Sequence, residues 1–76
     1  MPRIRTFARF ALFMYSKERH RRPHIHVEAP EARASLVLDT GEVLAGSAPA
    51  DMLREAREFI AANRDGLLAR WKELNG

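Results

Sequence analysis

The hydrophobic pattern of this 76-residue chain changes its period once, near Gly46. Before that glycine, apolar residues alternate with polar ones or form short runs, which is typical of β-strands. After it, apolar residues recur every three or four positions, which is typical of an amphipathic helix. A chain with its strands first and its helical part last predicts an α+β fold: a small antiparallel sheet with one or two helices packed on one face.

The strands are expected between about residues 3 and 46, and the sequence predicts three or four of them. Turn residues at Pro30-Glu31 and Thr40-Gly41 separate the later ones, and the polar segment 16–23 is expected to form a loop. The expected strands cover residues 10–15, 24–29, 32–39 and 42–46, and residues 4–7 form either an earlier strand or the start of the first.

The helical part is expected between about residues 48 and 75. Ser47 is a suitable N-cap, Pro49 suits the first turn, and Asn63 is expected to interrupt the helix and cap a second one. The apolar stripe comprises Met52, Leu53, Ala56, Phe59 and Ile60, followed by Leu67, Leu68, Trp71 and Leu74.

The composition restricts the class of protein. A chain of 76 residues is expected to form one domain, residues 1–76. It has no cysteine, which excludes disulfides and thiolate zinc sites. Its longest apolar run, Phe10–Tyr15, is far shorter than the roughly 20 residues that span a bilayer, and no signal peptide is apparent. We therefore expect a cytoplasmic protein without a membrane partner.

Basic residues are concentrated at the start of the chain. Residues 1–22 carry a net charge of +6, whereas the remaining residues carry −3. Arg19, Arg21 and Arg22 lie in the polar loop and are candidates for binding phosphate, as in RNA. The same arginines would also suit an ordinary solvated surface.

All three histidines, His20, His24 and His26, lie within seven residues of one another. On a strand, His24 and His26 share one face about 7 Å apart, and a loop could fold His20 back over them. Three such imidazoles could hold a divalent metal such as zinc, with Glu28 as a further ligand or an orienting carboxylate.

The same histidines could act without a metal. Neighbouring imidazoles can serve as general base and general acid, and the adjacent arginines would stabilise a phosphate. A third interpretation is structural, because the outer face of a sheet must be polar. The sequence leaves these three alternatives open.

The segment from Phe13 to Trp71 resembles a small prokaryotic family, domain of unknown function 4160 (DUF4160). The resemblance lies in a histidine core followed by helices with an asparagine-containing break and a late tryptophan. The matching residues are Met1-Pro2, Tyr15-Ser16, His20-Arg21-Arg22-Pro23-His24-Ile25-His26-Val27, Asn63 and Trp71. Arg22 replaces a proline of the family pattern, which loosens the loop that carries His20.

The resemblance implies a component of a compact gene pair of the toxin–antitoxin kind. It therefore implies a small partner protein encoded nearby and an RNA-directed activity. The leading hypothesis is a toxin–antitoxin-like component whose histidine face binds or cleaves RNA. If it cleaves RNA, it is a ribonuclease-like or metal-dependent hydrolase with His20, His24 and His26 as catalytic residues and with the loop arginines holding phosphate. The alternative is a non-catalytic module that binds a protein or nucleic acid, and an exposed sheet edge could also form a homodimer.

Overall fold

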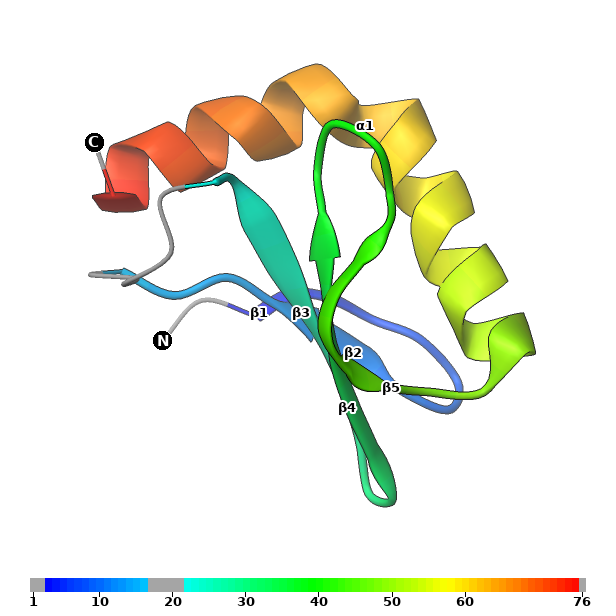
Figure 1. Cartoon of the computed structure of the whole chain (residues 1–76). Coiled ribbons are helices and arrows are strands. Elements are labelled where there is room, and N and C mark those ends of the chain that lie inside the picture. Colours follow the sequence, from blue (N-terminus) through cyan, green and yellow to red (C-terminus); the bar gives the residue numbers. More distant parts are fainter. Residues whose placement is uncertain (1–2, 17–21, 76) are drawn as a thin grey trace.

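The computed structural model describes residues 3–16 and 22–75. The described residues form one sheet of five antiparallel strands followed by one helix, and each strand pairs with its neighbour in the sequence (Figure 1). The elements are β1 (Arg3–Thr6), β2 (Ala11–Phe13), β3 (His24–Ala29), β4 (Ala32–Val37), β5 (Val43–Ser47) and α1 (Ala50–Asn75). The predicted α+β class is confirmed, with one strand more than expected because β1 pairs separately with β2.

The core lies between one face of the sheet and α1. Alternation along β3 directs Ile25 and Val27 toward the helix, and both are fully buried. The neighbouring strands and α1 supply the other core residues. These are Phe10, Leu12, Met14, Ala34, Leu36, Leu38, Met52, Ala56, Ile60 and Leu67.

Helix α1 runs as one element across the sheet, with a kink at Asn63 (φ −128°, ψ 20°). The kink confirms the predicted interruption, but the Asn63 side-chain amide donates to the Phe59 carbonyl (2.9 Å), at the end of the preceding turn. The prediction for Ser47 is wrong: Ser47 ends β5 opposite Arg33, and α1 begins three residues later.

Side chains of α1 hold it against the sheet along its length. Arg57 Nε donates to the Gly41 carbonyl (2.6 Å), and Arg64 Nε donates to the Leu38 carbonyl (2.9 Å). Near the far end, the Asn75 side-chain amide donates to the Tyr15 carbonyl (2.9 Å). The described part of the chain contains no helix that is long and apolar enough to span a membrane.

Candidate functional site on the outer face of the sheet

The face of the sheet opposite α1, called here the outer face, carries the polar residues of the strands. One cross-strand row runs from edge to edge, because each residue pairs with the next across the sheet. That row is Arg3, Phe13, His26, Ser35 and Ala45. The predicted shared face of His26 and Glu28 follows from the same alternation that buries Ile25 and Val27.

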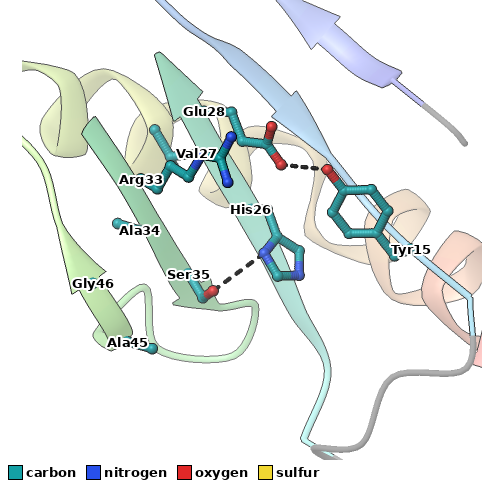
Figure 2. Close-up of a pocket in the computed structure, with 9 residues that line it drawn as sticks. All are labelled: Tyr15, His26, Val27, Glu28, Arg33, Ala34, Ser35, Ala45 and Gly46. Carbon is teal, nitrogen blue, oxygen red and sulfur yellow. Dashed lines mark hydrogen bonds between the residues drawn. The ribbon is translucent and has the colours of Figure 1, made fainter. Parts of the chain in front are cut away.

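A pocket of about 400 Å³ opens on the outer face between Tyr15 and β5 (Figure 2). Its polar side chains come from two strands, β3 and β4, and from Tyr15, which follows β2. The lining residues are Tyr15, His26, Val27, Glu28, Arg33, Ala34, Ser35, Ala45 and Gly46. The pocket therefore collects an imidazole, a carboxylate, a guanidinium, a phenol and a hydroxyl.

Glu28 is held in the pocket by Tyr15. The Tyr15 hydroxyl donates a hydrogen bond to Oε2 of Glu28, as Figure 2 shows. The Tyr15 ring also contacts the His26 ring edge-on, with the two ring centroids 4.8 Å apart. Oε1 of Glu28 has no hydrogen-bond partner among the described residues, so it can accept a proton or a donor from a ligand.

His26 is oriented by Ser35, its cross-strand partner on β4. His26 Nδ1 lies 3.3 Å from Ser35 Oγ (Figure 2). When the imidazole is protonated, Nδ1–H donates to the hydroxyl oxygen, and Nε2–H is the second acidic position. The Ser35 hydroxyl thus helps to orient the His26 ring.

Arg33 lies directly opposite Glu28 on β4 and is exposed. Within residues 3–16 and 22–75, its guanidinium makes no ion pair or side-chain hydrogen bond. Glu28 accepts from the Tyr15 hydroxyl, so the donor groups of Arg33 are not used on the Glu28 carboxylate. A guanidinium whose donors are available beside a pocket is suited to binding a phosphate group.

His24 has a different environment from His26. It is only 3% exposed, and its ring lies 6.5 Å from that of Trp71 on α1. Its Nδ1 lies 2.7 Å from the Arg22 carbonyl oxygen, to which Nδ1–H donates. The rings of His24 and His26 are 5.1 Å apart. His24 therefore lies beside His26 but does not line the pocket.

Only one of the remaining predicted site residues, Arg22, lies in the part of the chain that the structure describes. Arg22 pairs with Glu42 (3.1 Å), whereas Arg19, His20 and Arg21 lie outside the described residues. Among the residues that the structure describes, no three His, Cys, Asp or Glu side chains gather closely enough to hold a metal ion. The three-histidine metal site stays a prediction.

Arg33 and Ser35 were not predicted as site residues, and Tyr15 was assigned no role. The signal for the first two lies in the β3–β4 hairpin, where Ala29 pairs with Ala32 across a two-residue turn. A two-residue turn fixes the register, and this register places Arg33 opposite Glu28 and Ser35 opposite His26. Tyr15 reaches Glu28 only by leaning along the sheet, which no sequence pattern indicates.

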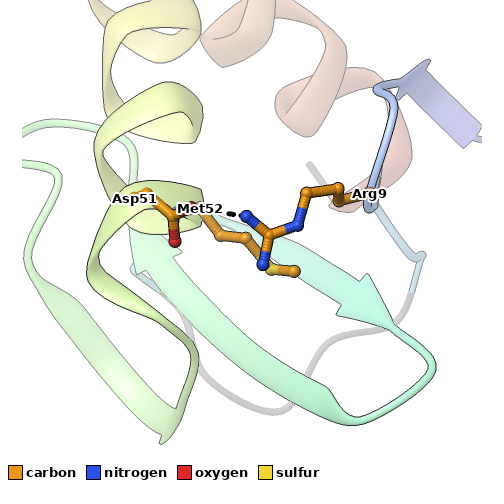
Figure 3. Close-up of polar contacts among 3 residues, drawn as sticks. All are labelled: Arg9, Asp51 and Met52. Atoms are coloured by element: carbon orange, nitrogen blue, oxygen red, sulfur yellow. Dashed lines mark hydrogen bonds and ion pairs between the residues drawn. The ribbon is translucent and has the colours of Figure 1, made fainter.

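A second hollow, of about 500 Å³, lies near the start of α1. It is lined by Ala8, Arg9, Ala29, Pro30, Glu31, Ala32, Pro49 and Met52. Arg9 is already paired with Asp51 (2.5 Å), whose Oδ1 also accepts from the Met52 amide (Figure 3). The basic group of this hollow is thus engaged, and its other charged lining residue is Glu31, so we take the pocket on the outer face, where five kinds of polar group meet, as the candidate site.

Comparison with known proteins identifies the family of this chain. No curated protein and no solved structure matches the chain. The sequence model of one family, described as "Domain of unknown function (DUF4160)", matches residues 10–72, which include every described polar residue of the pocket. The chain therefore belongs to the DUF4160 family.

Proposed function

We propose that the pocket on the outer face binds RNA and cleaves its phosphodiester backbone. The observation that carries this proposal is that Glu28, His26 and Arg33 line one pocket, with no ion pair formed by Arg33 among the described residues. A base, an acid and a cation for the phosphate are the groups that such a cleavage requires.

In the proposed reaction, Glu28 accepts the proton of a ribose 2′-hydroxyl. The resulting oxygen forms a bond to phosphorus, and the bond from phosphorus to the 5′-oxygen of the next nucleotide breaks. His26 Nε2–H protonates that leaving oxygen, and the product carries a 2′,3′-cyclic phosphate. Residues two positions apart on a strand lie about 7 Å apart on the same face, so His26 and Glu28 can flank a phosphate between them.

Arg33 binds the phosphate oxygens and stabilises the negative charge that develops during the displacement. His24 orients His26 through their ring contact, and its own ring is oriented by the Arg22 carbonyl. The catalytic pair that the geometry favours is thus Glu28 with His26, rather than His24 with His26, because His24 is buried.

The experiment measures cleavage of a fluorogenic single-stranded RNA by the purified protein. His26→Ala and Glu28→Gln are each expected to lower kcat by about 100-fold or more, the usual contribution of a general acid or base. Arg33→Met is expected to lower it by about 100-fold, as for other groups that stabilise a transition-state charge. Glu58→Gln and Arg54→Met, exposed substitutions of the same types on α1, serve as matched controls.

Two further experiments test the mechanism of cleavage, one with a modified substrate and one with a chelator. A 2′-deoxy residue at the cleavage site removes the nucleophile and should stop the reaction. Addition of a chelator tests whether His20, His24 and His26 hold a metal that the reaction needs. Unchanged cleavage by a His26→Ala, Glu28→Gln double variant that melts at the wild-type temperature would contradict the proposal.

The wider hypothesis is that this protein is one component of a toxin–antitoxin-like pair in the cytoplasm. It rests on the family resemblance and not on a contact in the structure. It predicts that a small protein encoded nearby co-purifies with the chain and suppresses the cleavage. A stable complex combined with no turnover under any condition would favour the alternative, a non-catalytic binding module.

A further inference from the structure

We propose that Phe13 is a stacking surface for a nucleobase, so that the pocket acts on single-stranded RNA with an unpaired base beside the cleaved phosphate. This inference deepens the proposed function and rests on it. It starts from an aromatic ring on the face of the sheet that α1 leaves uncovered.

Phe13 occupies the position next to the proposed acid. It is the cross-strand partner of His26 on the outer face, and it is half-buried. Its ring is parallel to that of Tyr15, with an angle of 3° between the planes and centroids 6.1 Å apart. Phe13 is absent from the helix-facing core cluster, so its ring does not serve the packing of α1.

Arg3 lies over the Phe13 ring, with its guanidinium carbon 5.4 Å from the ring centroid. Among the described residues, Arg3 has no acidic partner. A cation over a ring that solvent can reach is held more weakly than a base stacked on an aromatic side chain, so a nucleobase can replace Arg3 on the half-buried Phe13 ring. The displaced guanidinium then lies beside the RNA backbone, where it can pair with a phosphate.

The position of this surface fits one nucleotide chain. Neighbouring strands lie about 4.8 Å apart, so the base on Phe13 and the phosphate at His26 belong to the same or adjoining nucleotides. Arg33 lies on the other side of His26, on β4. The strand of RNA would thus cross the sheet from β2 to β4, between two arginines.

Stacking on Phe13 requires a base whose face is accessible. In a duplex, both faces of each base are covered by its neighbours, and single-stranded segments are where proteins stack aromatic side chains on bases. The geometry therefore selects single-stranded RNA over double-stranded RNA.

The test is a binding measurement that does not depend on cleavage. The probe is a fluorescein-labelled 2′-fluoro oligouridine of about eight nucleotides, within the usual site size, compared with a base-free oligomer of the same backbone. The wild-type protein is expected to bind the base-containing oligomer roughly 5- to 100-fold more tightly, as for one or more base–aromatic stacks.

Phe13→Leu should remove this preference, weakening binding of the base-containing oligomer without weakening binding of the base-free one. Phe13→Trp should keep the preference, because its ring also stacks. Phe59→Leu, which changes a half-buried phenylalanine on α1, is the matched control and should bind both oligomers like the wild type. Equal binding of both oligomers by the wild type, or equal binding of a duplex, would overturn the inference.

The outcomes separate this inference from the proposed function. Base-dependent binding without cleavage would leave the stacking surface in place and reject the nuclease. Cleavage that is unaffected by Phe13→Leu would support the nuclease and reject the stacking surface. An absence of binding to any oligomer would reject both.

Discussion

At the scale of single residues, Gly46 is the described glycine at which an added Cβ atom would meet the closest contact. Its φ is +77°, and a Cβ atom there would lie 2.2 Å from the Arg33 carbonyl oxygen and 3.1 Å from the Ala34 Cα. Both contacts are with backbone, which cannot move without separating β5 from β4. Gly46→Ala is therefore expected to lower the free energy of unfolding by about 2–4 kcal/mol, as measured by urea denaturation. An unchanged midpoint would contradict this close approach of the two strands.

The residues of the site could be predicted only in part. Alternation placed His26 and Glu28 on one face without any knowledge of the fold. It could not show that His24 is buried, because the ring that contacts it, Trp71, comes from the distant end of α1. Likewise, alternation could not show that the Glu28 carboxylate accepts a hydrogen bond from the Tyr15 hydroxyl instead of forming an ion pair with Arg33. The burial of His24 and the partner of Glu28 depend on side-chain length and on packing between residues distant in the sequence, which alternation does not indicate.

At the scale of elements, α1 contains a glycine that the fold does not require. Nothing lies within 4 Å of a Cβ atom built on Gly66, and its φ is not positive. Gly66→Ala removes backbone freedom from the unfolded chain and is expected to raise the free energy of unfolding by about 0.5–1 kcal/mol. The same denaturation measurement checks it, and the sign should be opposite to that of Gly46→Ala. A loss of stability would mean that the turn after Asn63 needs a glycine.

The elements themselves were largely readable from the sequence. Residues 24–29 form β3 as predicted, because strict alternation is a strong strand signal. The helical segment is kinked at Asn63, whose backbone leaves the helical region, and it reaches the core on both sides of the kink through Ile60 and Leu67. Ser47 was a wrong cap because its backbone instead pairs with Arg33, a contact set by register.

At the scale of the whole molecule, an ion pair joins the β1–β2 connection to the first turn of α1. The hydrogen bond from Arg9 holds the pKa of Asp51 below its usual value of 3.8. The stability from this pair is therefore present above pH 3.8 and is lost as the pH falls through the lowered pKa. Asp51→Asn should melt slightly below the wild type at pH 5–8, and the difference should vanish in acid.

Salt provides the control for this pair, since both side chains are more than half exposed. A high salt concentration should shrink the difference in melting temperature at neutral pH. A difference that persists at low pH and in high salt would assign the effect of Asp51 to something other than its charge.

The order of the elements also affects how the chain emerges from the ribosome. The five described strands precede α1. The sheet face that carries Leu12, Ile25 and Leu36 is therefore translated before the helix that packs on it. Pairing between sequence neighbours lets the strands associate early, because local contacts form quickly. Until α1 has been translated, however, the nascent sheet presents an apolar surface to solvent, and such surfaces bind chaperones or aggregate. Biogenesis of this small protein should therefore depend on the completion of its last 26 helical residues.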